Sequence, residues 1–112
     1  MTKTKELEEI RYHFQEFFEL TSESNMKFKE HYEETYNGGA FDTKTKRLIA
    51  LCGGIVAGCK GCILGQADLA IQHGATVEEI MEVCGIALSL GGTLAGSQIA
   101  LVVQLLKEKG MV

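Results

Sequence analysis

The apolar positions of this chain recur at helical spacing along most of its length. The first set falls three or four residues apart: Leu7, Ile10, Phe14, Phe17 and Phe18. This spacing predicts an amphipathic helix from about Lys3 to Leu20. A second, shorter helix is expected to end at Asn37-Gly38-Gly39, and it carries the apolar residues Met26, Phe28 and Tyr32. No stretch alternates long enough to predict a strand.

The middle of the chain predicts two helices that meet at a glycine. Asp42 is a candidate N-cap for a helix from about Thr43 to Val56, because its carboxylate can accept free backbone N–H groups. Gly58 breaks this apolar segment, and Cys59-Lys60-Gly61-Cys62 stands where the next helix begins. That helix is expected to stop at His73-Gly74, with His73 near its C-terminal cap.

Two more helices are predicted towards the C-terminal end. Thr76-Val77-Glu78-Glu79 has the spacing of a capping box and starts a helix that runs to about Leu90. Gly91-Gly92 separates it from a last helix, from about Thr93 to Lys109. The sequence therefore predicts an all-α, single-domain bundle of about six helices over residues 1–112. Residues 1–38 would form the N-terminal helices and residues 39–109 the core.

One stretch is apolar enough to raise the question of a membrane. Residues Val83 to Leu106 carry no charge, which matches the length of a membrane span. Glycine, serine and glutamine dilute the stretch, Gly91-Gly92 would interrupt it, and no basic cluster or aromatic belt flanks it. We interpret it as two short helices buried in a core and in a subunit interface, and we expect no membrane partner.

Composition narrows the class of protein. The chain has 112 residues, 46% of them apolar, and a chain this small buries only a modest fraction of its surface alone. A homo-oligomer is therefore expected. The net charge is -4 and no basic stripe exists, which argues against nucleic-acid binding. The chain starts with charged rather than apolar residues, so we expect no signal peptide and a cytoplasmic protein.

The Cys59-Lys60-Gly61-Cys62 motif is the leading candidate for chemistry. Two cysteines at this spacing can close a disulfide across one turn, and N–H groups at a helix start favour the thiolate. The thiolate is the species that attacks disulfides and peroxides. In a cytoplasmic protein the motif is more typical of redox chemistry than of a structural bridge. A buried inactive pair is the alternative. Zinc is disfavoured, because no second pair of ligands appears in the sequence.

For the other cysteines and carboxylates, the position along the predicted helices indicates whether a catalytic role is expected. Cys52 and Cys84 lie on apolar helix faces and are expected to be core thiols. Asp68 follows the second cysteine of the motif by six residues, which places it on the far side of the helix, so no catalytic role is expected. Glu33 and Glu34 would be the acids of the site if the second helix folds over it.

Four segments together resemble one protein family. They are the predicted helix Phe41 to Leu51, the segment Gly58 to Ile63 followed by Ala67, the helix start Gly74 to Ile80, and the pair Gly91-Gly92. This combination resembles the carboxymuconolactone decarboxylase family, with its alkylhydroperoxidase-D-like members, over well over half of the chain.

The resemblance implies an all-helical protein that assembles into trimers or hexamers, sometimes dimers. It implies an antioxidant peroxidase or disulfide oxidoreductase in which Cys62 attacks a small peroxide or disulfide substrate and Cys59 resolves the intermediate. An external thiol or dithiol would re-reduce the disulfide, and no bound cofactor is implied. Helix-dipole reasoning alone favours Cys59 as the attacking cysteine, so both assignments stay open.

Two positions depart from the family pattern. The family relay places a glutamate twelve residues before the first cysteine and a histidine four after the second, where this chain has Arg47 and Gln66. Arginine cannot act as a base, and glutamine cannot shuttle a proton near neutral pH. Arg47 is either a solvated helix residue or a cation that stabilises a thiolate. Gln66 either packs or hydrogen-bonds a sulfur or a substrate.

Three functions are consistent with these residues. The leading hypothesis is a thiol-dependent oxidoreductase with Cys59, Cys62, Gln66 and Arg47 as the candidate catalytic residues. The second is a decarboxylase of a small lactone acid, against which the missing ionisable groups at positions 47 and 66 count. The third is a non-catalytic oligomeric binding protein that has kept the fold.

Overall fold

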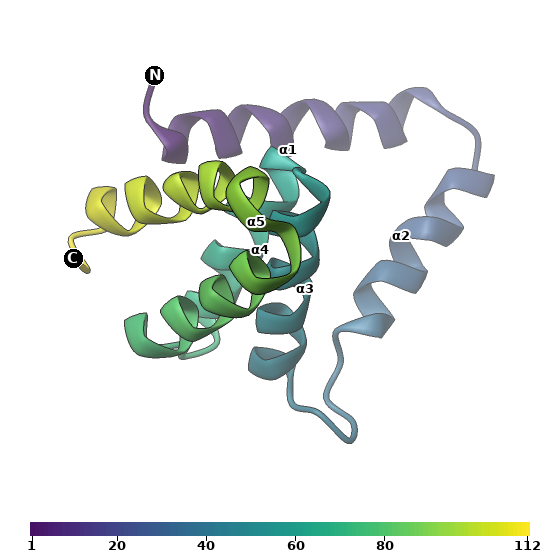
Figure 1. Cartoon of the computed structure of the whole chain (residues 1–112). Coiled ribbons are helices and arrows are strands. Elements are labelled where there is room, and N and C mark those ends of the chain that lie inside the picture. Colours follow the sequence, from purple (N-terminus) through teal and green to yellow (C-terminus); the bar gives the residue numbers. More distant parts are fainter.

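The structure, a computed structural model, describes residues 1–112 and contains helices as its only regular elements. They are α1 (Lys3–Leu20), α2 (Ser24–Thr35), α3 (Thr43–Ala57), α4 (Lys60–Gln72) and α5 (Val77–Glu108). Helices α3, α4 and α5 pack together, α1 crosses one end of this bundle, and α2 stands away from it (Figure 1). The prediction of an all-α helical bundle is confirmed.

The last two predicted helices are joined in α5, which bends at the predicted glycine pair. Gly92 has a φ of 60° and a ψ of -145°, a conformation that residues with side chains rarely adopt. At Gly91 an added Cβ would lie 2.7 Å from the Cβ of Ala95, so there is no room for a side chain. The break is therefore a kink inside one helix rather than a loop, and the structure has five helices.

The predicted capping residues act as expected. The Asp42 carboxylate accepts a backbone N–H of the first turn of α3 at 2.8 Å. Thr76 and Glu79 form a complete capping box at the start of α5. Gly58 ends α3 with a φ of 70°, and His73 is the C-cap residue of α4. These local interactions explain why the helix bounds follow from the sequence.

The hydrophobic core lies between α3, α4 and α5. Its largest fully buried side chains are aliphatic: Leu51, Ile55, Ile63, Leu64, Ile80, Leu105, Leu106 and Val102. Helices α3 and α4 meet closely at Gly54, where an added Cβ would lie 3.1 Å from the Cβ of Cys62. This contact places the start of α4 against the last turns of α3.

Helix α5 alone is long and apolar enough, by length and composition, to cross a membrane. Side chains on both sides of its kink are buried: Ile80, Cys84, Ala87, Ala95, Val102, Leu105 and Leu106. Large apolar side chains on its outer face remain exposed: Ile86, Leu88, Leu90 and Leu94. The helix thus contributes one face to the core and leaves an apolar face uncovered.

Asp68 is a buried carboxylate that joins three parts of the fold. It accepts hydrogen bonds from Arg11 of α1 at 3.0 Å, from Lys109 after α5 at 2.7 Å, and from Gln72 at 2.9 Å. Burial raises the pKa of the Asp68 carboxyl, but the hydrogen bonds and charges of Lys109 and Arg11 outweigh this effect and hold the pKa below its usual value. Asp68 is therefore an ionised part of the scaffold.

Asp68→Asn should lower the free energy of unfolding by about 1–3 kcal/mol, because it leaves Arg11 and Lys109 without their shared carboxylate. Urea unfolding measures this change. Glu8→Gln is the matched control: Glu8 forms an exposed pair with Lys5, so its loss should cost less than about 0.5 kcal/mol.

The same comparison has a defined pH dependence. The folded pKa of Asp68 is depressed, so its stabilisation is present above the unfolded pKa, near ~4, and is lost as pH falls through the folded pKa. The difference between the wild type and Asp68→Asn should therefore shrink below about pH 4. A difference that stays constant into strong acid would contradict this role.

Candidate active site at the start of α4

Cys59 and Cys62 form a disulfide at the start of α4. Their Cα atoms are 5.2 Å apart, and Cys59 is the N-cap residue of the helix. Its Sγ accepts the backbone N–H of Cys62 at 3.2 Å, so this sulfur lies at the positive end of the helix dipole. Cys62 is exposed and Cys59 is half-buried. An outside molecule therefore meets Cys62 first, whereas the helix end favours a thiolate at Cys59.

The turn between α3 and α4 positions this disulfide. The positive φ of Gly58 lets the chain reverse at once, and the backbone N–H of Cys59 donates to the carbonyl oxygen of Gly54 at 3.1 Å. Because Gly54 has no side chain, Cys62 can lie directly against α3. The pair is thus held by backbone geometry on both sides of the turn.

Arg47 of α3 and Gln66 of α4 meet one helical turn beyond Cys62. Nη1 of Arg47 donates to Oε1 of Gln66 at 3.1 Å and to the hydroxyl of Tyr32 at 2.8 Å. Nε2 of Gln66 donates to the same hydroxyl at 2.8 Å. The three side chains close a ring of hydrogen bonds between α2, α3 and α4. The interpretation of Arg47 as a solvated helix residue therefore does not hold.

The aromatic side chain of Tyr36 covers the guanidinium group of Arg47. Cζ of Arg47 lies 3.7 Å from the centroid of the Tyr36 ring and 5.4 Å from that of Tyr32. Such stacking of arginine on aromatic faces is favourable, more so where water is excluded. Burial raises the pKa of the Tyr36 phenol, Tyr32 adds to this shift, and Arg47 opposes it. Tyr36 is therefore neutral near pH 7 and acts as an aromatic cover.

Sequence reasoning did not anticipate these two tyrosines. It proposed Glu33 and Glu34 as the residues that α2 would bring to the site, but both are exposed and form no hydrogen bond with Arg47 or Gln66. The spacing of Tyr32 and Tyr36 was the available signal. Residues four apart share a helix face, and two phenol side chains on one face can both contact the same side chain.

Cys52 and Cys84 are free thiols, and both pack in or against the core as expected. Burial, together with the nearby Cys52, raises the pKa of the Cys84 thiol to about 11. Cys84 therefore stays protonated at neutral pH. Cys59–Cys62 is the only disulfide in the structure.

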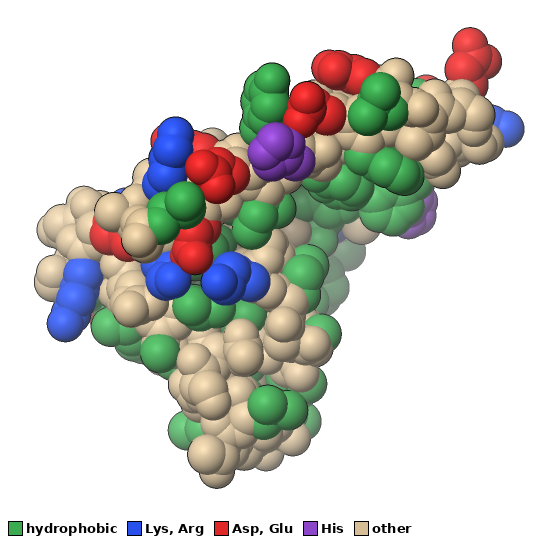
Figure 2. Space-filling view, turned by 90° about the horizontal axis from the view of Figure 1, so that it is seen from above, with side chains coloured by type: hydrophobic (Ala, Val, Ile, Leu, Met, Phe, Trp, Pro, Cys, Tyr) green, Lys and Arg blue, Asp and Glu red, His purple; other side chains and the backbone are tan.

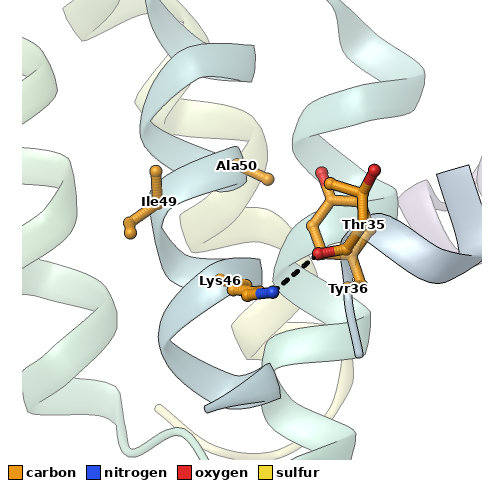
Figure 3. A pocket seen from close by; sticks show the side chains of 5 residues that line it. All are labelled: Thr35, Tyr36, Lys46, Ile49 and Ala50. Carbon is orange, nitrogen blue, oxygen red and sulfur yellow. Dashed lines mark hydrogen bonds between the residues drawn. The ribbon is translucent and has the colours of Figure 1, made fainter. Parts of the chain in front are cut away.

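An open groove lies between the end of α2 and α3 (Figure 3). Its lining residues are Thr35, Tyr36, Lys46, Ile49 and Ala50. Nζ of Lys46 donates to the carbonyl oxygens of Thr35 at 2.9 Å and of Asn37 at 2.6 Å, so its charge closes the C-terminal end of α2. Neither cysteine of the disulfide lines this groove.

Comparison with known proteins identifies relatives of this architecture. A model of the carboxymuconolactone decarboxylase family matches residues 25–104. A family protein from Legionella pneumophila superposes with a TM-score of 0.87 and 26% identity over 95% of each chain. A family protein from Thermotoga maritima superposes with a TM-score of 0.85 and 30% identity, over 92% of this chain and 88% of the other. An involvement in the antioxidative response has been suggested for the Thermotoga protein.

Two curated sequences match a shorter region. An uncharacterised protein of Cupriavidus necator is 35% identical over 54 residues, and uncharacterised protein 4 of the cox locus of Paracoccus denitrificans is 42% identical over 52 residues. Each match spans about half of this chain and about half the length of the relative.

Mild peroxide treatment should oxidise Cys59 and Cys62 to a disulfide and leave Cys52 and Cys84 as thiols. Trypsin cuts after Lys60 and leaves one cysteine of each pair in both neighbouring peptides, so two labels are needed. Iodoacetamide under denaturing conditions marks the free thiols, and N-ethylmaleimide after reduction marks the bridged ones. Fragment masses then assign each cysteine. A bridge between Cys52 and Cys84, or no bridge at all, would contradict the assignment.

Proposed function

This chain belongs to the carboxymuconolactone decarboxylase family, and we propose that it is a thiol-dependent oxidoreductase that works through the Cys59–Cys62 disulfide. The observation that carries the proposal is the position of this disulfide. Its Cys62 end is exposed at the start of α4, and its Cys59 end accepts a hydrogen bond from the helix N-terminus. The antioxidative role suggested for the Thermotoga relative agrees with this function.

In the reductive half-reaction, a thiolate of an external dithiol attacks Sγ of Cys62, the more exposed residue of the pair. The Cys59–Cys62 bond breaks as the mixed disulfide forms, and the electron pair leaves with Sγ of Cys59 as a thiolate. The Cys62 N–H and the helix dipole stabilise this leaving group. The second thiolate of the donor then attacks the mixed disulfide. Cys62 is released as a thiolate, and the donor departs as a disulfide after transferring two electrons.

In the oxidative half-reaction, the Cys62 thiolate attacks the substrate. With a disulfide, it forms a mixed disulfide and releases one substrate thiolate; the Cys59 thiolate then displaces the other and re-forms the bridge. With a hydroperoxide, the O–O bond breaks, the alkoxide takes up a proton to give the alcohol, and Cys62 carries a sulfenic acid. The Cys59 thiolate converts this to the disulfide with loss of hydroxide.

The surroundings of Cys62 favour disulfide exchange over peroxide reduction. An alkoxide needs a proton as it leaves, whereas a thiolate is a stable leaving group near neutral pH. Gln66 and Arg47, one turn away, donate hydrogen bonds but do not transfer protons at this pH. We therefore expect slow peroxidase activity and faster disulfide reduction.

We further propose that the protein is a homo-oligomer, a trimer or a hexamer. Only 20 of 112 residues are buried, and the radius of gyration of 14.3 Å exceeds the roughly 13 Å expected for a compact chain of this length. Apolar side chains gather on the arm formed by α1 and α2: Phe14, Phe17, Met26 and Phe28 (Figure 2). With the outer face of α5, this arm supplies surface typical of a subunit interface.

The function is tested by turnover of a dithiol with an organic disulfide or hydroperoxide. Cys62→Ser should reduce the rate to that of the uncatalysed reaction. Cys59→Ser should slow the reaction, because release of Cys62 then depends on the external dithiol alone, while the control Cys52→Ala stays active. In the absence of the dithiol, Cys59→Ser, which keeps the Cys62 thiol, should accumulate a mixed disulfide with the substrate, visible as added mass. Trapping by Cys62→Ser instead would reverse the roles of the two cysteines. Full activity in both single variants would overturn the proposal.

Sedimentation at micromolar concentration should show an assembly larger than the monomer. Because Leu90 and Leu94 are both exposed on α5, the double variant Leu90→Glu with Leu94→Glu should shift the distribution to smaller species by burying unpaired charge in the interface. Circular dichroism serves as the control for retained helix content. A wild-type protein that sediments only as a monomer would refute the assembly.

A further inference from the structure

Arg47 carries a positive charge that no carboxylate of this chain neutralises. Six other cationic side chains pair with Asp or Glu: Lys3, Lys5, Arg11, Lys44, Lys60 and Lys109. The two acceptors of Arg47 are neutral, the hydroxyl of Tyr32 and the amide oxygen of Gln66. A half-buried charge without a counter-ion is costly, so this environment is suited to an anion supplied from outside the chain.

The guanidinium of Arg47 has one free edge. Nη1 makes both of its hydrogen bonds to protein, and no protein acceptor contacts Nη2. Nε is the one buried side-chain polar atom of the chain that has no hydrogen-bond partner. The Nε and Nη2 hydrogens of arginine lie parallel and bind both oxygens of a carboxylate. The unused donors therefore match a carboxylate better than a single-point anion.

Neighbouring residues hold the free edge of the Arg47 guanidinium in place. The adjacent Lys46 is engaged elsewhere, so Arg47 is the cation at this position that can bind an anion. Hydrogen bonds to Tyr32 and Gln66 hold Nη1 in position. The aromatic ring of Tyr36, stacked on the guanidinium, fixes the plane of that group. Lys46, the adjacent cation in the sequence, is bound to backbone carbonyl oxygens at the end of α2 (Figure 3). The orientation of the guanidinium is thus set before a carboxylate binds, and access to the buried Nε requires a shift of the side chains that cover it.

We infer that Arg47 is a subsite for a substrate carboxylate, and that the substrate of the Cys59–Cys62 pair is a small organic disulfide that carries one. This inference rests on the proposed function. Arg47 contacts Gln66, which follows Cys62 by one turn, or roughly 6 Å along α4. The carboxylate of such a substrate would bind Nε and Nη2 while its sulfur faces Sγ of Cys62.

Two disulfides that differ only in charge test the subsite. Dithiodipropionate carries carboxylates, and dithiodipropionamide is its neutral counterpart of nearly the same shape. With dithiothreitol as donor, the measured quantity is the ratio of kcat/KM for the acid to that for the amide. Arg47→Met should lower this ratio roughly 10- to 100-fold, mainly through the KM of the acid. Arg47→Lys keeps the positive charge but loses the two parallel N–H donors of the guanidinium. Its acid-to-amide ratio should lie between those of the wild type and Arg47→Met.

Lys27→Met is the matched control, because it removes the same unit of charge from an exposed residue of α2 that forms no ion pair. Its acid-to-amide ratio should equal that of the wild type. An unchanged ratio in Arg47→Met, or an equal fall in Lys27→Met, would overturn the subsite.

A binding measurement separates the subsite from the redox function. The Nε–H of Arg47 gives a proton–nitrogen NMR signal that Arg47→Met lacks, and propionate should shift it saturably while propionamide does not. A propionate shift without disulfide turnover would retain the subsite and refute the proposed function. Turnover with neither a shift nor an acid preference would refute the subsite and retain the function. The titration itself uses the wild-type protein, and the variant serves only to assign the signal.

Discussion

The close approach of α3 and α4 at Gly54 is the constraint on which the candidate site depends. An added Cβ at this position would lie 3.1 Å from the Cβ of Cys62, which is closer than ordinary van der Waals contact, so the start of α4 would have to shift by a few tenths of an ångström. Because the helices touch here, positions farther from the turn face one another, and the long side chain of Arg47 reaches Gln66. The disulfide and the hydrogen bonds of Arg47 with Gln66 therefore both depend on the packing of α3 against α4, and they lie one helical turn apart.

The charged residue in the scaffold has oppositely charged partners, whereas the charged residue at the candidate site has none. Asp68 is neutralised by Arg11 and Lys109, and this junction ties α1 and the end of α5 to α4. Arg47 is surrounded by neutral acceptors and aromatic rings, which offset only part of the cost of removing its charge from water. A departure from the rule that buried charges are paired is more typical of functional positions than of scaffold positions.

Local interactions explain how much of this architecture the sequence predicts. The caps at Asp42 and Thr76 and the redox motif at the start of α4 depend on residues within one turn, so their spacing along the chain is sufficient. The contact of Tyr32 with Gln66 joins residues 34 apart, and it depends on the path by which α2 returns towards the bundle. No periodicity encodes that path, so sequence reasoning chose neighbouring glutamates instead.

The attachment of α2 connects the candidate site with the surface left open for assembly. No residue of α2 is buried, and the side chains that join it to α3 and α4 are polar or stacked on Arg47. Phe28 of the same helix remains 56% exposed. A helix that buries no apolar face gains little stability from its own chain, so a subunit that covers Phe28 would also hold Tyr32 in place. The geometry around Arg47 would then depend on assembly as well as on the fold of one chain.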